Sequence, residues 1–227
     1  MRILLLILAV FAAAVALFAF VVRPWYNGWG ATQAAQAQSL PGDDLVPEPR
    51  LTSTRSVIIH APADKVWPWL IQLGYGKAGW YNHDWINCGL FGARYYEGRH
   101  SSSHILPQFQ NLKVGDIVPL GPDSGWEVIR LEPNRLMVLT AWVDLKSGRS
   151  VKAGDPEPAQ SYIHSSEVYL LEELDANTTR FTVRDRLDFE MGGANIVGYV
   201  MEPGYFIQES AFMKGVKKRA EALYRTS

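Results

Sequence analysis

The chain has 227 residues, of which 48% are hydrophobic and 12% aromatic, with 22 lysines and arginines against 23 aspartates and glutamates. The net charge of −1 excludes nucleic acid as a partner, because phosphate binding needs a clustered basic surface. Cys88 is the single cysteine, which excludes a fold built on intrachain disulfides.

The amino terminus is typical of a membrane anchor. Residues Ile3–Val22 contain no polar side chain, and about 20 apolar residues in a helix match a hydrocarbon core of about 30 Å. Trp25 and Tyr26 follow, and such rings favour the membrane interface. A cleaved secretory signal is the alternative, although its apolar core usually has only about 7–15 residues. We expect an uncleaved single-pass anchor over residues 1–24 in the cell membrane, with the amino terminus inside and the domain outside the cytoplasm.

Residues 25–50 are predicted to form a linker. They are rich in Gly, Ala, Gln, Ser and Pro and show no apolar period, a composition typical of a tether. The folded domain is then expected to cover residues 51–227.

The domain begins with a strand followed by a helix. Leu51–Ile59 is β-branched and alternating, which predicts a strand. A helix is expected from about Ala61, because Pro62 suits a first helical position and Asp64 complements the helix dipole. Gly74 is expected to end it.

The rest of the chain predicts an antiparallel sheet closed by a long helix. Between them, Lys146–Gln160 is predicted to be a loop. The carboxyl-terminal helix is expected over Tyr205–Tyr224, with one apolar side. This order predicts an α+β fold. The expected strands are Asp116–Leu120, Trp126–Leu131, Leu136–Val143, Tyr162–Leu174 and Thr179–Phe189.

Gly74–Gly79 matches the G-x-G-x-x-G spacing of dinucleotide-binding loops. Such a loop must follow a strand and open a helix. Here the glycines follow a predicted helix and lead into Trp-Tyr-Asn-His-Asp-Trp. The pattern therefore predicts a turn that presents Trp80, and no nucleotide or other cofactor is expected.

Three stretches resemble a known superfamily: "APADKVWPWLIQLGYGKAGWYNHDWIN", "VGDIVPL" and "FMKGVKKRAEAL". They are similar to the helix-grip proteins, which include START-related, polyketide-cyclase-like and pollen-allergen-like members (SRPBCC), and to a bacterial branch with a preceding membrane segment. The resemblance covers the chain from about Gly42 to the carboxyl terminus. It implies a sheet that grips the carboxyl-terminal helix around a cavity for an apolar ligand, but no particular reaction.

Aromatic residues are the candidate ligand contacts, since small-molecule pockets are mostly apolar with a few placed polar groups. Each of them could equally be an ordinary core residue, and the cluster in the Gly-rich loop is the strongest candidate. The predicted contacts are Trp80, Tyr81 and Trp85 at the mouth, Trp126 and Trp142 on the wall, and Phe206 and Met213 from the helix.

Asp185 is the most informative polar candidate. It alternates with Val183 and Leu187 on the apolar face of its strand, where a carboxylate needs a partner or a raised pKa. A structural ion pair and a role in a site are both open. Its neighbours Arg184 and Arg186 are expected to face solvent. His164 alternates with Tyr162 and Val168 and is expected to face inward as well. With Asp84 and His83 it completes the set of candidate acid–base residues.

No metal site is predicted, because His100 and His104 lie in a serine-rich loop without a third ligand at a recognisable offset. Three functions are open: a membrane-tethered binding or carrier domain for a hydrophobic small molecule or lipid, a cyclase or dehydratase that uses acid–base residues in the same cavity, and an adaptor that holds a partner protein through exposed tryptophans.

Overall fold

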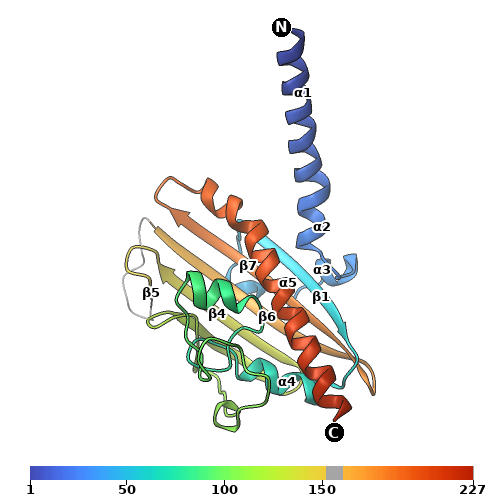
Figure 1. The fold of residues 1–227 in the computed structure, drawn as a ribbon, viewed down its shortest axis with the longest axis vertical. Coiled ribbons are helices and arrows are strands. Elements are labelled where there is room, and N and C mark those ends of the chain that lie inside the picture. Colours follow the sequence, from blue (N-terminus) through green and yellow to red (C-terminus); the bar gives the residue numbers. More distant parts are fainter. Residues whose placement is uncertain (152–160, 227) are drawn as a thin grey trace.

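One antiparallel sheet and one long helix across its face dominate the fold (Figure 1). The computed structural model describes residues 1–151 and 161–226. The strand order is β1-β7-β6-β4-β3-β2, with β5 paired to β4, and every pairing is antiparallel. The strands are β1 (Leu51–Ile59), β2 (Ile117–Pro119), β3 (Gly125–Glu132), β4 (Leu136–Asp144), β5 (Arg149–Ser150), β6 (Ser161–Asp175) and β7 (Thr178–Met191).

Helix α5 (Ile196–Arg225) packs on the inner face of this sheet, and α4 (Ala63–Ile71) packs against α5. This arrangement confirms the predicted α+β helix-grip class. Helix α5 begins at Ile196 rather than at Tyr205, with Pro203 inside it. The shorter helical segments of the domain are η3 (Trp85–Leu90) and η4 (Pro107–Phe109). Of the predicted loop Lys146–Gln160, Arg149–Ser150 form β5, and residues 152–160 lie outside the described residues.

The inner face of the sheet holds the main core. Tyr169 of β6, Phe181 of β7 and Phe212 of α5 are all buried. Their ring centroids lie 5.5 to 5.9 Å apart, each ring contacting the other two. Fully burying an apolar side chain of this size contributes roughly 1.5–3 kcal/mol, so these contacts hold α5 to the sheet.

The outer face of the sheet is covered by residues 25–50, the segment predicted to be a linker. It contains α3 (Gln33–Ala37) and η2 (Asp43–Leu45), and Leu40 packs with Val138 and Val168 in a second apolar cluster. The segment therefore lies against the domain along much of its length.

Arg184 holds this cover in place. It points away from α5, as the alternation predicts, but the expectation of solvent exposure is wrong because only 3% of its surface is exposed. Its guanidinium donates to the carbonyl oxygens of Ala35 (2.8 Å) and Gln38 (2.6 Å) and to Oδ2 of Asp43 (2.9 Å). Arg186 likewise donates to the Val46 carbonyl at 2.9 Å. Both arginines are covered because the segment that packs on this face brings backbone carbonyls that need hydrogen-bond donors.

The amino terminus forms a continuous helix that projects from the domain (Figure 1), made of α1 (Arg2–Leu17), η1 (Phe18–Val22) and α2 (Arg23–Asn27). Residues Arg2–Asn27 are long and apolar enough to cross a bilayer, a test that a signal sequence also passes. Helix α2 contacts both β1 and α5.

The glycine-rich loop closes on itself. The N–H groups of Gly74 and Gly79 each donate to the other's carbonyl at 3.3 Å, and Tyr75 donates to the Pro119 carbonyl at 2.7 Å. Gly74, Gly76 and Gly79 all have positive φ, a conformation that glycine adopts without strain. Backbone donors that a phosphate would need are thus used within the protein.

Candidate functional site

A cavity of about 610 Å³ lies between the inner face of the sheet and α5. Its walls come from β1, β3, β4, β6, β7, α5 and the loop around η3. Its apolar lining includes Leu51, Trp80, Phe91, Leu120, Trp126, Ala141, Val143, Ile163, Leu187 and Phe212. This volume and lining fall within the range of small-molecule sites in proteins.

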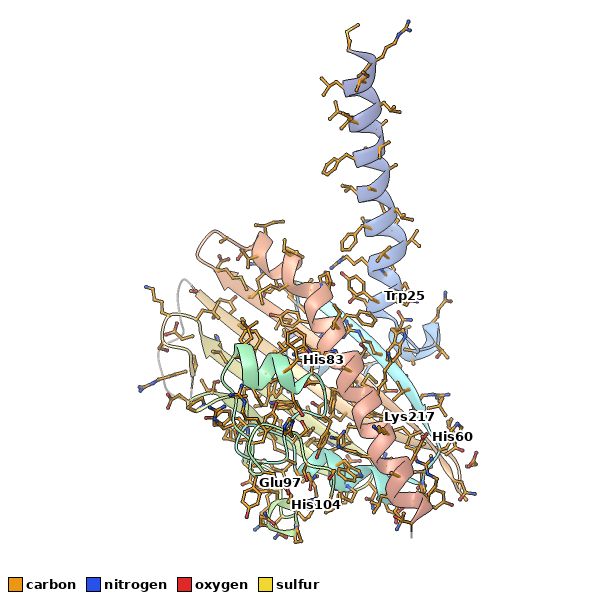
Figure 2. All side chains as sticks on the ribbon, in the orientation of Figure 1. Trp25, His60, His83, Glu97, His104 and Lys217 are labelled. Carbon is orange, nitrogen blue, oxygen red and sulfur yellow. The ribbon has the colours of Figure 1, made fainter. Side chains whose placement is uncertain are left out.

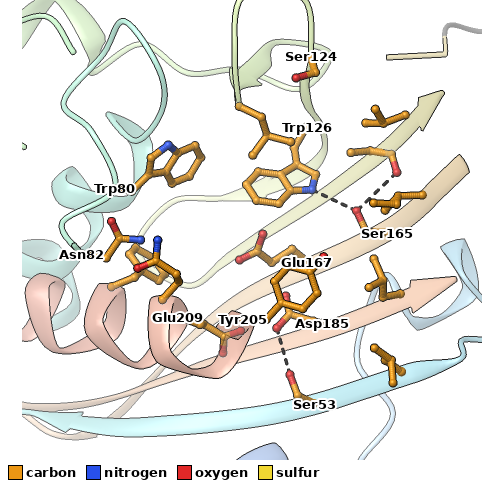
Figure 3. Close-up of a pocket in the computed structure, with 18 of the residues that line it drawn as sticks. Ser53, Trp80, Asn82, Ser124, Trp126, Ser165, Glu167, Asp185, Tyr205 and Glu209 are labelled. Atoms are coloured by element: carbon orange, nitrogen blue, oxygen red, sulfur yellow. Dashed lines mark hydrogen bonds between the residues drawn. The ribbon is translucent and has the colours of Figure 1, made fainter. Parts of the chain in front are cut away.

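Two tryptophans face each other across one side of the cavity (Figure 3). Trp80 from the glycine-rich loop and Trp126 from β3 meet edge to face, with centroids 5.6 Å apart and planes at 83°. The Trp126 indole N–H donates to the Ser165 hydroxyl at 3.3 Å. The loop glycines thus place Trp80 in contact with Trp126 of β3.

Three carboxyl groups from three elements converge in the same cavity (Figure 3). Glu167 of β6 and Asp185 of β7 are register partners in neighbouring strands. Glu209 reaches them from α5. The Ser53 hydroxyl of β1 donates to Asp185 Oδ2 at 3.0 Å. Acidic side chains this close to one another in an apolar cavity cannot all be ionised without a compensating charge.

Arg55 supplies positive charge to this cluster. Its Nη1 lies 2.6 Å from Glu209 Oε2 and 3.6 Å from Asp185 Oδ2, and its side chain is only 2% exposed. The same guanidinium donates through Nε to the Tyr26 carbonyl at 2.8 Å and through Nη2 to Asn27 Oδ1 at 3.2 Å. One buried cation therefore serves two carboxyl groups and the end of the anchor helix.

The electrostatics favour protons on part of the cluster. Burial raises the pKa of Glu209 well above its ordinary value, with the Asp185 charge adding to the rise and Arg55 opposing it. Burial also raises the pKa of Glu167, again assisted by Asp185 and opposed by a hydrogen bond with Tyr169 and by Arg55. The raised pKa values of Glu167 and Glu209 favour carboxyl groups that hold a proton inside the cavity.

Two buried acceptors on α5 have no hydrogen-bond partner among the described residues. They are Oε1 of Gln208 and Oε1 of Glu209, and both side chains line the cavity. Buried polar atoms are nearly always paired, and an unpaired one costs about 1–3 kcal/mol. A donor on a bound molecule would satisfy Gln208, and a hydroxyl, which both donates and accepts, would satisfy Glu209 with or without its proton.

Trp80, Trp126 and Asp185 are the predicted site residues that line the cavity. Trp142 and His164 do not line it, which corrects the expectation that both face inward. The cavity takes Ala141 and Val143 from β4, and Ile163 and Ser165 from β6. Neighbouring strand residues point to opposite faces. His164 and Trp142 instead stack on each other with centroids 4.8 Å apart.

Four other predicted ligand contacts also lie outside the cavity lining. Tyr81 and Met213 are buried in the core, where the Tyr81 hydroxyl accepts from Gln72 Nε2 at 2.7 Å. Phe206 stacks on Tyr26 of α2 at 5.6 Å. Trp85 is 73% exposed. The reason is local: Tyr81 lies against Trp69 of α4, Phe206 against α2, and Trp85 turns toward solvent.

Two predicted acid–base candidates are also absent from the lining. Asp84 accepts from the Ser101 backbone N–H at 2.7 Å and from the Ser101 hydroxyl at 2.6 Å, which is a structural role. His83 lies at the turn before η3 (Figure 2), and its carbonyl accepts from the Ile86 N–H at 2.9 Å. No group of three or more His, Cys, Asp or Glu in the described part of the chain has a metal-binding arrangement.

Sequence reasoning missed Glu167, Glu209 and Arg55. Glu209 carries a readable signal, because it is three residues before Phe212 and seven before Val216, on the helix face that packs inward. Glu167 alternates with Ser165 and Tyr169 on the inner face. The apolar residue Val168 next to it suggested the opposite face as the internal one. Arg55 gives no signal, since its partners come from distant elements.

No family model matches the chain, and no curated protein matches it in sequence. Solved structures do resemble it. A hypothetical protein from Helicobacter pylori is 14% identical, covers 84% of this chain and 99% of its own, and has a TM-score of 0.46. An aromatase/cyclase from a Streptomyces species is 16% identical over 75% of this chain and 93% of its own, with a TM-score of 0.30. A norcoclaurine synthase point mutant from Thalictrum is 13% identical over 78% and 96%, with a TM-score of 0.37. Similarity at this level assigns no activity to the chain.

Proposed function

We propose that this protein is a membrane-anchored binding protein for a hydrophobic small molecule or lipid whose polar end carries a hydrogen-bond donor. The observation that carries the proposal is the cavity of about 610 Å³ with apolar walls between the sheet and α5. Its volume suits a ligand of drug size or the end of a larger lipid.

The polar end of the cavity defines the ligand's orientation. Apolar groups lie against Trp80 and Trp126, and a hydroxyl or amine reaches the unpaired acceptors of Gln208 and Glu209. The apolar helix at the amino terminus supports a location at the bilayer, where sparingly soluble ligands are concentrated.

Extraction from the full chain tests this proposal. The protein is purified from membranes into lipid nanodiscs, extracted with organic solvent and analysed by mass spectrometry beside the variant Ala141→Phe. Ala141 is 5% exposed and lines the cavity, so a phenyl ring there takes space that a ligand would occupy. Ala176→Phe, in the exposed β6–β7 turn, is the matched control.

We expect a compound enriched in the wild type and in Ala176→Phe, and depleted at least about tenfold in Ala141→Phe, a loss of about 1.4 kcal/mol or more in binding. Identical extracts from all three proteins would contradict a ligand in this cavity. Circular dichroism of each variant shows that the comparison is between folded proteins.

Acid–base catalysis on the bound molecule is the second candidate, and the carboxyl cluster favours it. A protonated Glu209 would donate a proton while Asp185 accepts one, as a cyclisation or dehydration requires. The extracted compound, incubated with wild-type protein and with Asp185→Asn, decides between binding and turnover. Conversion by the wild type alone would make the protein an enzyme.

A further inference from the structure

The first two turns of α5 expose an apolar surface without charge. From Met191 to Met201 the sequence reads MGGANIVGYVM, with no acidic or basic residue. In the structure, Ile196 is 69% exposed, Val200 71% and Met201 47%. Contiguous exposed apolar side chains mark an interaction surface.

We propose that this surface, residues 196–201, lies in the headgroup region of the same bilayer that α1 crosses, as a second membrane contact of the domain. The inference rests on the proposed membrane anchorage. It adds a docking face and an entry route for the ligand.

The position of this surface along the axis of the anchor helix follows from contacts between α2 and α5. Arg23 pairs with Glu202 at 2.8 Å, the Trp25 and Phe206 rings meet at 5.6 Å, and the Lys214 ammonium lies 5.0 Å from the Trp29 ring centre. Residue numbers rise together in both segments, so they run in the same direction.

Residues before Glu202 therefore lie level with residues before Arg23, which are the apolar end of the anchor. Figures 1 and 2 show the start of α5 at the end of the domain from which α1 projects. Six helical residues span about 9 Å, close to the depth of about 5–10 Å to which interfacial helices bury their apolar face.

Charge and chemistry favour lipid over a protein partner. Glu202, the first acidic residue after the stretch, is buried and paired with Arg23, so it presents no free carboxylate to the headgroups. Trp25, 58% exposed, contacts Phe206 further along α5, and its ring suits the interface. At this height beside the anchor, the bilayer is what the side chains meet.

The surface leads to the cavity. Tyr205 follows Met201 by about one helical turn; its side chain lines the cavity and is 38% exposed. An apolar ligand can therefore pass from the bilayer along the start of α5 into the cavity without crossing water.

Depth measurement on the full chain tests the proposal. The protein is placed in vesicles of phosphatidylcholine and phosphatidylglycerol, and nitroxide labels are introduced at Leu8, Val200 or Lys218 in a Cys88→Ala background. Collision with oxygen and with a water-soluble nickel chelate is compared by electron paramagnetic resonance. Leu8 reports the anchor, and exposed Lys218 reports the far end of α5.

We expect oxygen collisions to dominate at Leu8 and Val200, and nickel collisions at Lys218. If Val200 behaves like Lys218 while Leu8 remains in lipid, the docking surface is overturned and the anchor stands. If Leu8 itself is in water, the membrane part of the proposed function fails too.

A second measurement needs no substitution. Wild-type protein is crosslinked in the same vesicles to phosphatidylcholine with a photoreactive acyl chain and digested. We expect adducts on peptides from α1 and from residues 191–205, and none on peptides from residues 214–225. Adducts on α1 alone would overturn the docking surface.

Discussion

Asp185 and Glu209 share the guanidinium of Arg55, whose Nη1 lies 2.6 Å from Glu209 and 3.6 Å from Asp185. Removing one partner of a buried ion pair typically costs about 3–5 kcal/mol, because the remaining charge is left without compensation. The cluster is therefore sensitive to loss of the cation and tolerant of losing one acid.

Arg55→Met should lower the free energy of unfolding by about 3–5 kcal/mol at a pH above the raised pKa of Glu209, where its carboxylate is charged, measured by thermal unfolding of the full chain in detergent. Arg180→Met is the matched control, since its half-exposed pair with Glu172 spans 3.5 Å and such pairs contribute at most about 1 kcal/mol. Adding Glu209→Gln to Arg55→Met should restore part of the loss. Equal effects of the two single substitutions would show that Arg55 compensates no buried charge.

The raised pKa values of Glu167 and Glu209 predict how stability depends on pH. Between the ordinary glutamate pKa of about 4.3 and the raised value in the folded protein, the folded state holds protons that the unfolded state has released. The contribution of these groups to stability therefore falls as pH rises through that window.

Glu209→Gln removes this dependence and should raise the melting temperature relative to wild type more at about pH 8 than at about pH 5. Glu132→Gln is the control, because the pKa of partly exposed Glu132 is lowered by Arg130 and its contribution is already complete above about pH 5, so the difference from wild type should be nearly the same at both pH values. A difference between Glu209→Gln and wild type that does not change with pH would contradict the raised pKa.

At the scale of elements, alternation and turn residues sufficed to predict β1, the β6–β7 hairpin and α4. They placed Asp185 on the inner face. The same alternation misplaced His164, which shares a face with apolar Val168. That face is the outer one, because Val168 packs under Leu40. Composition gave no sign that residues 25–50 cover the sheet, since their fixed position depends on Arg184 in β7.

The start of α5 escaped prediction as well. Gly198, Pro203 and Gly204 are poor helix formers, yet the helix runs through them. Gly198 is required by packing, because a Cβ there would lie 2.4 Å from the Phe189 ring. Tertiary contacts outweigh propensity at this element, and Glu209 was missed as a site residue because the helix face was assigned from its carboxyl-terminal half.

Arg184→Ala should release the cover of the outer face, because four of its acceptors lie in residues 35–43. Limited proteolysis of the full chain should then cut between residues 31 and 50 at least about tenfold faster. This corresponds to a free energy of local opening that is lower by about 1.4 kcal/mol. Arg180→Ala should leave the rate near that of wild type. Unchanged cleavage in Arg184→Ala would mean that the apolar cluster around Leu40 holds the segment alone.

At the scale of the whole molecule, ligand and stability are linked. A ligand that binds only the folded state stabilises it by about 2.7 kcal/mol at a hundredfold excess over its Kd. The wild type with its extracted compound restored should therefore melt several degrees above the delipidated protein. Ala141→Phe should show no such difference, and an equal rise in that variant would place the compound outside the cavity.

Arg55 links the end of the anchor helix to the carboxyl cluster, since it donates to Tyr26 and Asn27 through two of its nitrogens and to Glu209 through the third. A guest whose donor binds Glu209 shares that carboxyl group with Arg55 and so alters the contact where the anchor meets the domain. Coupling of this kind is reciprocal. We therefore expect a change in bilayer thickness that tilts the anchor to change the affinity for the guest, and the bound guest to change the tilt of the anchor in return, with Arg55 carrying the coupling.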